Sequence, residues 1–179
     1  GLLVQQTQKA VFLCRAFHQG HHQLLMVSLA YRRRAIPIAW TWVKHVRGHS
    51  SGEQQMRLLA HVGTLLPKKA PVFVVGDFNE PSHLDWTAAA ADSGRHPIKV
   101  AYPNSLEMAK AGFADAWRTI HPDEMKKPGF TWTPLKKADN PTIHHDRIDY
   151  VYAKGKGVKV TDAKVIGENQ ENADIVVSP

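Results

Sequence analysis

The sequence predicts a mixed fold of the α/β (α+β) class, and three observations support this. Residues 71–75 form a continuous apolar run that leads into Gly76, which is typical of a strand buried on both faces. Residues 50–66 carry an apolar stripe at helical spacing just before that strand. Elsewhere strands and short helices mix without βαβ regularity, and no internal repeat is visible.

The first part of the chain is expected to hold three strands and one helix. The strands are predicted at residues 11–14, 24–30 and 35–43. Pro37 has no N–H to donate to a neighbouring strand, so the third strand is expected at a sheet edge or at the start of a pairing. Ser50 and Glu53 have the spacing of a capping box, which predicts the start of the helix.

The part after the central strand is expected to hold short elements. Ser82 with Asp85 predicts the cap of a helix over residues 86–91. Asn104 with Glu107 predicts the cap of another helix that stops at Gly112. Residues 113–117 are expected to continue that helix or to turn against the core. Further strands are predicted at residues 130–133, 147–152, 158–161 and 163–166.

Composition limits the classes of function. The chain has 179 residues and a formal charge of +7 with pI about 9.6, which favours polyanionic partners, although solvated lysines alone would give the same balance. Cys14 is the single cysteine, so neither an intrachain disulfide nor a cysteine-based zinc site is expected. No membrane span is expected, because no run of eighteen apolar residues occurs. The chain starts without Met or a signal pattern, so a fragment or a processed product is expected.

Two polar features stand out from this background. Asp77 and Asn79 follow the central strand, at the edge of a sheet where open α/β folds place their chemistry. A carboxylate and an amide mounted there suit a hard divalent cation and a phosphate ester, whereas an Asx-turn within the backbone is the alternative. The basic run at residues 32–34 lies beside tryptophans, so it predicts either contact with a nucleic-acid backbone or a solvated turn.

Three motifs occur in order along the chain: Gly76-Asp77-Phe78-Asn79, Phe130-Thr131-Trp132 and Arg147-Ile148-Asp149-Tyr150. Together they resemble the endonuclease/exonuclease/phosphatase superfamily, whose members are metal-dependent phosphoesterases with a four-layer α-β-β-α sandwich. The resemblance implies a partial sandwich over residues 71–179 and Mg²⁺ or Mn²⁺ as the cofactor. It also implies a phosphate-ester substrate, with nucleic acid among the candidates.

The same resemblance implies roles for individual residues. Asp77 would bind near the metal and handle the attacking water or the leaving oxygen, and Asn79 would contact the metal and the phosphoryl group. Asp149 would orient a catalytic group or the second metal region, although a strand aspartate paired with Arg147 or a lysine is the alternative. The further candidates are His45 as a catalytic histidine by its spacing, and Trp132, Arg147 and His83 on the substrate side. Of these, Arg147 is better suited to brace its strand than to touch substrate.

The resemblance also shows what the chain lacks. The superfamily has an early metal-binding glutamate preceded by asparagine, and residues 1–70 contain no clear counterpart. It closes with an Asp-His pair, and the chain ends at Pro179 before one. We therefore expect a chain that is incomplete as an enzyme.

Residues 24–77 resemble a second family, the DDE-type insertion-sequence transposases, which have a ribonuclease-H-like fold and bind two metals through carboxylates. This resemblance implies a distinct segment over residues 1–70, joined to residues 71–179 somewhere in 66–77, with the two parts separate or packed as one domain. Three hypotheses follow: a phosphoesterase, a transposase remnant that binds DNA, or a non-enzymatic fragment without a stable native state.

Overall fold

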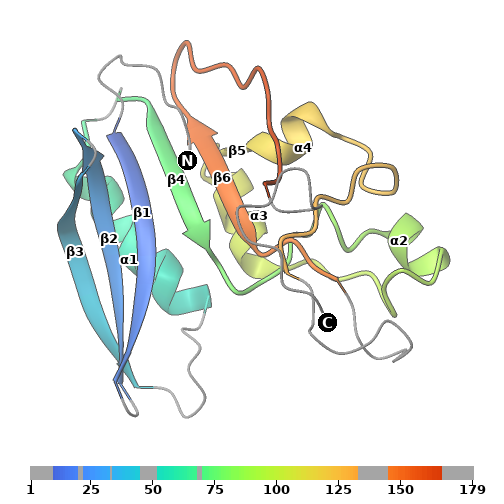
Figure 1. Cartoon of the computed structure of the whole chain (residues 1–179), viewed down its shortest axis with the longest axis horizontal. Coiled ribbons are helices and arrows are strands. Elements are labelled where there is room, and N and C mark those ends of the chain that lie inside the picture. Colours follow the sequence, from blue (N-terminus) through green and yellow to red (C-terminus); the bar gives the residue numbers. More distant parts are fainter. Residues whose placement is uncertain are drawn as a thin grey trace.

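The structure is a computed structural model, and it describes residues 10–19, 22–32, 34–44, 52–67, 70–132 and 145–166 (Figure 1). The elements follow one another along the chain as β1 (Ala10–Gln19), β2 (His22–Tyr31), β3 (Arg34–Lys44), α1 (Gly52–Leu65), β4 (Val72–Asp77), α2 (Ala88–Asp92), α3 (Pro103–Lys110), β5 (Ala114–Asp115), α4 (Ala116–Ile120) and β6 (Asp149–Lys154).

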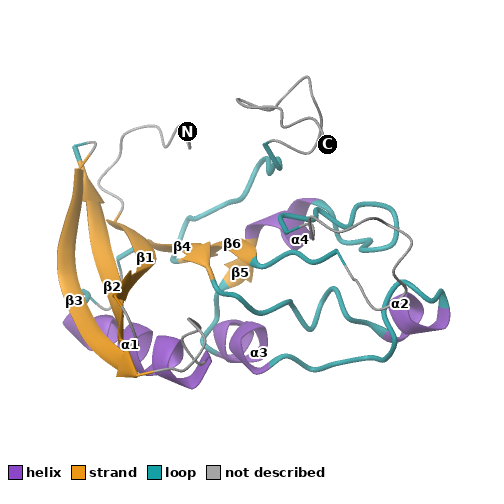
Figure 2. Cartoon of the chain, turned by 60° about the horizontal axis from the view of Figure 1, so that its bottom comes forward, coloured by secondary structure: helices purple, strands orange, loops and turns teal. Residues whose placement is uncertain are grey.

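One six-stranded sheet organises the described residues, with the strand order β3-β2-β1-β4-β6-β5. The first three strands form an antiparallel meander, β4 pairs parallel with β1, and β6 pairs antiparallel with β4. Helices α1 and α3 lie next to each other on one face of this sheet (Figure 2). The α+β class is therefore confirmed, and a sheet with helices on it is consistent with part of a four-layer sandwich.

The expected strands of the first part are confirmed, and all three are longer than the sequence indicated. β3 lies at the edge of the sheet, as Pro37 predicted, and its pairing with β2 shifts register between Val27 and Ser28, next to the proline. The shift fits the missing N–H of proline, which interrupts a regular ladder. Arg32 and Arg34 at the turn are exposed, as a basic turn should be.

The core lies between the sheet and α1. Buried side chains alternate along β2 and β4, as the twofold period of a strand requires, and α1 contributes Leu58 and Val62 to the same cluster. The central strand was expected to be buried on both faces, but Phe73 and Val75 are only half-buried. The difference arises because α1 and α3 cover one face of the sheet. None of the helices in the described parts of the chain is long and apolar enough to cross a membrane.

Two helix starts differ from the prediction. α2 begins at Ala88, and its cap is Thr87, whose side chain accepts the N–H of Ala90 at 3.1 Å. Ser82 instead closes a tight turn by accepting the N–H of Leu84 at 3.1 Å, while the Asp85 carboxylate is held by arginines. Helix α3 begins at Pro103, whose fixed φ suits a first helical position, so the predicted cap residue Asn104 lies inside the helix.

The later strand predictions were less accurate. Residues 113–117 turn into the short strand β5 and the helix α4. Of the strand expected at 130–133, the structure describes residues 130–132, which form one isolated bridge, between Trp132 and Asp146. β6 begins at Asp149 rather than at residue 147. No strand forms in 158–161 or 163–166, two stretches that the structure does describe. Their β-branched residues gave a strand pattern, but β-propensity counts only where a partner strand is available.

Candidate active site

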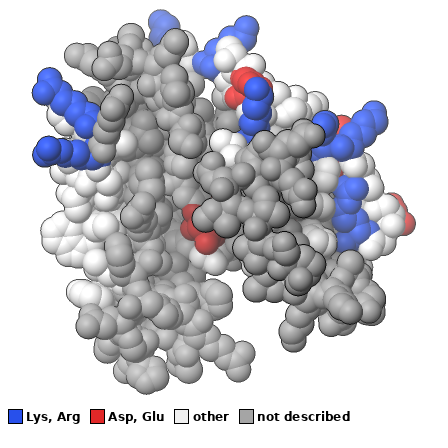
Figure 3. Space-filling model, in the orientation of Figure 1, with Lys and Arg blue, Asp and Glu red and all other residues white. Residues whose placement is uncertain are grey.

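Asp77 and Asp149 stand directly opposite each other across two antiparallel strands. Asp77 is the last residue of β4, and its register partner is Asp149, the first residue of β6. Opposite residues on such strands project to the same face with Cβ atoms about 5 Å apart. Figure 3 shows acidic surface near the middle of the drawn face, where β4 ends in Figure 1. The structure therefore brings together two of the carboxylates that the sequence selected.

The electrostatics of this pair are unfavourable without a counter-charge. Neighbouring atoms remove part of the hydration of Asp149, which raises its pKa, and the charge of Asp77 raises the pKa further. A hydrogen bond with the Thr131 side chain lowers that pKa and opposes both effects. Two like charges placed face to face favour binding of either a cation or a proton.

Asn79 is fixed by a turn that begins at Asp77. Its N–H donates to Asp77 Oδ1 at 2.8 Å, so the predicted Asx-turn is present. Asn79 adopts φ +49°, a left-handed conformation that asparagine tolerates better than most residues. The turn engages one carboxylate oxygen through one hydrogen bond, so it does not prevent Asp77 from binding a ligand as well.

Phe78 explains why the two polar residues project outward. Its ring is buried and packs edge-on against Tyr150 and Tyr152, with ring centroids 5.5 and 5.6 Å away. Its N–H donates to the carbonyl of Ile148 at 2.9 Å, and its carbonyl accepts from the side chain of Gln55 at 3.3 Å. The inward aromatic ring thus alternates with exposed Asp77 and Asn79 on either side.

The motif Phe130-Thr131-Trp132 is hydrogen-bonded to the segment that leads into β6. Thr131 Oγ1 accepts the N–H groups of Ile148 and Asp149, each at 3.1 Å. The Thr131 and Trp132 N–H groups both donate to the carbonyl of Asp146, at 3.0 and 2.9 Å. Trp132 keeps 44% of its surface exposed. All three sequence motifs therefore meet at this end of the sheet.

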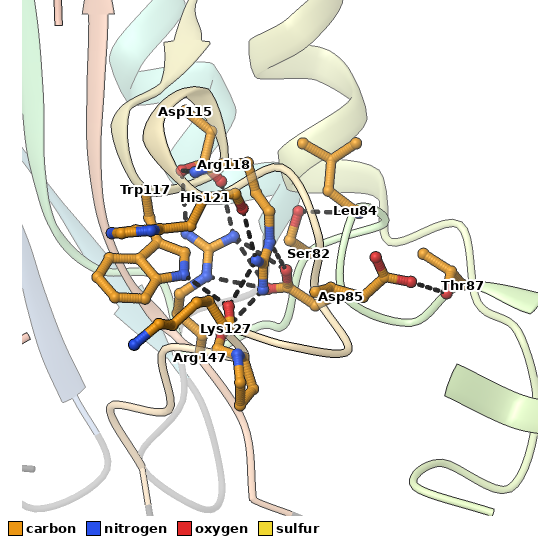
Figure 4. A network of polar contacts seen from close by, with 12 residues as sticks. Ser82, Leu84, Asp85, Thr87, Asp115, Trp117, Arg118, His121, Lys127 and Arg147 are labelled. Atoms are coloured by element: carbon orange, nitrogen blue, oxygen red, sulfur yellow. Dashed lines mark hydrogen bonds and ion pairs between the residues drawn. The ribbon is translucent and has the colours of Figure 1, made fainter. Parts of the chain in front are cut away.

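Arg147 lies in the interior, which corrects its place among the substrate-side candidates. Its side chain is 2% exposed and donates to the carboxylates of Asp85 and Asp115, with the shortest contact, Nη2 to Asp115 Oδ2, at 2.7 Å (Figure 4). A substrate could reach it only by breaking these ion pairs. The structure also excludes an ion pair between Arg147 and Asp149, and it supports the bracing role.

Arg118 completes a buried network that sequence reasoning missed. Its Nε donates to Asp85 Oδ1 at 2.6 Å, and its other nitrogens donate to the carbonyls of His121, Lys127 and Pro128. Two arginines and two aspartates therefore balance each other in charge inside the protein (Figure 4). Sequence spacing did not reveal this set as a whole, because its members come from three separate segments: Asp85, the start of α4 with Asp115 and Arg118, and Arg147.

His83 lies on the turn that leaves the site. Its ring is half-buried, and Nδ1 lies 2.8 Å from the Oγ of Ser105 on α3. Burial lowers the pKa of His83, while the nearby charges of Asp85 and Asp115 oppose that change. His45, the catalytic histidine that spacing suggested, lies outside the described residues.

Glu80 is a second residue that the sequence analysis did not select. Its Oε1 accepts the N–H of Asn104 at 2.8 Å, at the positive end of the α3 dipole. Its carbonyl oxygen lies 3.0 Å from the hydroxyl of Tyr150, whose single proton also faces the carbonyl of Arg147 at 2.6 Å. Burial raises the pKa of Glu80. Glu80 thus anchors the chain that directly follows Asn79.

The described donors fit part of a cation shell. Asp77, Asn79 and Asp149 offer carboxylate and amide oxygens, which are the ligands that Mg²⁺ and similar hard cations prefer. Within the described ranges, however, no three His, Cys, Asp or Glu side chains converge on one point. The case for a cation at this place therefore rests on the chemical type of these donors, which are carboxylate and amide oxygens.

The chain is similar to one curated protein from Caenorhabditis elegans. It carries the name uncharacterized protein F14F9.5 and is 38% identical over 90 residues, which cover 48% of this chain and 28% of the relative. The match therefore spans less than a third of the relative's length. No solved structure matches the chain.

The model of the Endonuclease/Exonuclease/phosphatase family matches residues 7–172. This range includes the three motifs and all of residues 24–77, the stretch that resembled a transposase. It also agrees with the sheet, since β1 and β4 pair with each other across the proposed boundary between the two segments. The chain belongs to the endonuclease/exonuclease/phosphatase family.

Proposed function

We propose that the chain carries the catalytic end of a divalent-metal-dependent phosphoesterase that hydrolyses a phosphodiester or a phosphomonoester. The observation that supports this most is the Asp77–Asp149 pair, with Asn79 fixed beside it by the Asx-turn. Paired carboxylates at the end of neighbouring strands repel each other, and a bound cation removes that repulsion.

The cation would be Mg²⁺ or Mn²⁺, held by the side-chain oxygens of Asp77 and Asn79. When bound, it would neutralise the negative charge of the phosphoryl oxygens and lower the barrier to attack by water. Because these two residues sit on a turn pinned by the buried Phe78, their oxygens are held in place before a ligand arrives.

Side chains of the protein would supply the other interactions that the reaction needs. The Asn79 amide can donate to a phosphoryl oxygen as charge develops there. A carboxylate with a raised pKa accepts a proton more readily near neutral pH, which suits Asp149 to take a proton or to hold a group that does. The exposed ring of Trp132 could stack on a base if the substrate is a nucleic acid.

The test is hydrolysis of bis(p-nitrophenyl) phosphate by the full chain with Mg²⁺ or Mn²⁺. We expect activity that EDTA abolishes and that Asp77→Asn lowers by about 100-fold or more. Asp92→Asn on α2 is the matched control, because Asp92 is an exposed carboxylate outside the site. Equal turnover by wild type and Asp77→Asn, or turnover that persists in EDTA, would refute the proposal.

A further inference from the structure

One buried glutamine on α1 contacts the turn that carries the proposed site, so its role rests on the proposed function. Gln55 is 3% exposed, and its Nε2 donates to the carbonyl oxygen of Phe78 at 3.3 Å. Phe78 stands between Asp77 and Asn79, the two residues that would hold the cation. The contact therefore joins α1 to the backbone between two proposed ligands.

The Phe78 carbonyl and the Asn79 N–H belong to one peptide unit, and both ends of that unit are hydrogen-bonded. The carbonyl accepts from Gln55, and the N–H donates to Asp77 Oδ1 at 2.8 Å. In a planar trans peptide the C=O and N–H groups point in opposite directions. Gln55 therefore holds the carbonyl toward α1, and this directs the N–H away from α1 and toward the Asp77 carboxylate.

The opposite orientation of this peptide unit is unfavourable. A half-turn of the unit would place the Phe78 carbonyl against the Asp77 carboxylate, and oxygens that can only accept hydrogen bonds would then face each other. The end of the Gln55 amide that faces the turn is also defined by chemistry. Because a carbonyl only accepts, that end must be the NH₂ group.

The backbone of Asn79 requires such support. Its φ of +49° is left-handed, and a residue other than glycine keeps this conformation only where its surroundings enforce it. The buried ring of Phe78 fixes its own side chain, whereas the rotation of the peptide unit that follows depends on the partners of its C=O and N–H. Gln55 is the partner on the α1 side.

Gln55 is itself held in place by the helix. Leu58 and Val62 of α1 belong to the core cluster and are 7% and 2% exposed. Gln55 precedes Leu58 by three residues, and Leu58 precedes Val62 by four, so the three side chains share one face of α1. An amide anchored to a packed helix gives the turn a fixed point of support.

We propose that Gln55 is a positioning residue of the phosphoesterase site. Its side-chain amide fixes the peptide unit between Phe78 and Asn79, and this unit orients the Asp77 carboxylate for the cation. Gln55 itself touches neither the cation nor the substrate. Groups that orient a metal ligand in this way typically contribute about 10- to 100-fold to metal affinity.

The binding test uses Gln55→Met, which removes the amide and keeps a side chain of similar length. Arg57→Met is the matched control, because it places the same side chain on the exposed surface of α1. In titration calorimetry of the full chain with Mg²⁺, we expect Kd to rise about tenfold in Gln55→Met and to stay unchanged in Arg57→Met. Hydrolysis of bis(p-nitrophenyl) phosphate should fall in Gln55→Met and recover at saturating Mg²⁺.

The outcomes separate the role of Gln55 from the proposed function. Equal Mg²⁺ affinity of Gln55→Met and wild type, or a loss of hydrolysis that saturating Mg²⁺ does not restore, overturns the role of Gln55 alone. Failure of wild type to bind Mg²⁺ overturns both. If Gln55→Met shows no cooperative unfolding in urea, Gln55→Asn takes its place, since it keeps an amide but withdraws it by one methylene group.

The link between Gln55 and the Asp77 carboxylate has a readout that needs no cation. In hydrogen exchange followed by NMR, we expect the Asn79 amide to exchange about fivefold faster in Gln55→Met than in wild type, as the weakening of one hydrogen bond would give. The amide of Val74, in the middle of β4, should keep its rate. An Asn79 rate that Gln55→Met leaves unchanged would overturn the inference even if Mg²⁺ affinity fell.

Discussion

Arg147 Nε donates to Asp85 Oδ2 at 3.0 Å, and this bond joins two segments that lie 62 positions apart in the sequence. Arg147 stands two residues before Asp149, and Asp85 stands six residues after Asn79. The bond therefore connects the segment that leads into Asp149 with the turn that follows Asp77 and Asn79. Buried ion pairs add little net stability, but breaking one is costly, since the partner is left charged and desolvated.

Replacing Arg147 should strongly destabilise the fold. Arg147→Met leaves Asp85 and Asp115 without their main counter-charge, and we expect a loss of about 3–5 kcal/mol in the free energy of unfolding by urea. Arg57→Met is the matched control, because Arg57 forms an exposed pair with Glu53, and a change of about 0.5 kcal/mol or less is expected there. Similar losses for both variants would contradict the bracing role.

The same unfolding curves bear on the hypothesis of a non-enzymatic fragment. A chain without a stable native state would show no cooperative transition in urea or on heating. We expect one cooperative transition, because a single sheet joins the strands from both halves of the chain.

Gly129 should tolerate no side chain, because one would clash with Trp117. Gly94 serves as the comparison, since a side chain there meets only the strain of the backbone conformation. Both Gly129 and Gly94 have positive φ, +69° and +77°. A Cβ at Gly129 would lie 2.3 Å from Cε2 of Trp117, whereas at Gly94 it would meet nothing within 4 Å. Gly94→Ala should therefore cost about 1 kcal/mol of backbone strain, and Gly129→Ala should cost clearly more in urea unfolding. Equal costs would show that Trp117 moves aside freely.

The elements that sequence reasoning found have strong local signals. The strands around residues 24–30, 35–43 and 71–75 and the helix before Pro67 carry apolar patterns that local physics interprets directly. The site could be predicted as well, because the strand ends at Gly76-Asp77-Phe78-Asn79. Phe78 is buried there, and the polar residues on either side of it are not. The position of Asp77 opposite Asp149 then follows from the pairing of β4 with β6.

The elements that it missed depend on distant partners. Asp85 has the spacing of a helix cap with Ser82, but two arginines from 33 and 62 positions away bind its carboxylate instead. A buried arginine and a solvated one look the same in a sequence, so the network of Asp85, Asp115, Arg118 and Arg147 gave no signal. Residues 158–166 were predicted as strands for a similar reason. Their pattern is that of a strand, and it does not show whether a partner strand exists.

The raised pKa of Asp149 gives a defined pH dependence. Because the folded chain binds this proton more tightly than the unfolded chain, the resulting stability is present below the unfolded pKa and is lost as pH rises through the folded pKa. Without divalent cations, wild type should lose more stability than Asp149→Asn between pH 3 and pH 7. At pH 7 the variant should gain about 0.5 kcal/mol, as repulsion from Asp77 disappears.

Urea unfolding of both proteins across this pH range measures the difference, and the other carboxylates cancel in it. Asp92→Asn is the control, since it removes an exposed carboxylate of α2 and should follow wild type. A variant that tracks wild type at every pH would mean that Asp149 and Asp77 do not interact.

A divalent cation should reverse that repulsion and stabilise the fold. A ligand that binds only the folded state adds RT ln(1 + [L]/Kd), which is about 1.4 kcal/mol when its concentration is tenfold above Kd. We expect Mg²⁺ to raise the free energy of unfolding of wild type more than NaCl of equal ionic strength, and the excess to vanish in Asp77→Asn, which loses a charged ligand. Asp92→Asn should keep the full Mg²⁺ effect, because its carboxylate lies on α2 away from the strand ends. Stabilisation that is equal in all three proteins would place the cation elsewhere, even if the chain proved to be an active phosphoesterase.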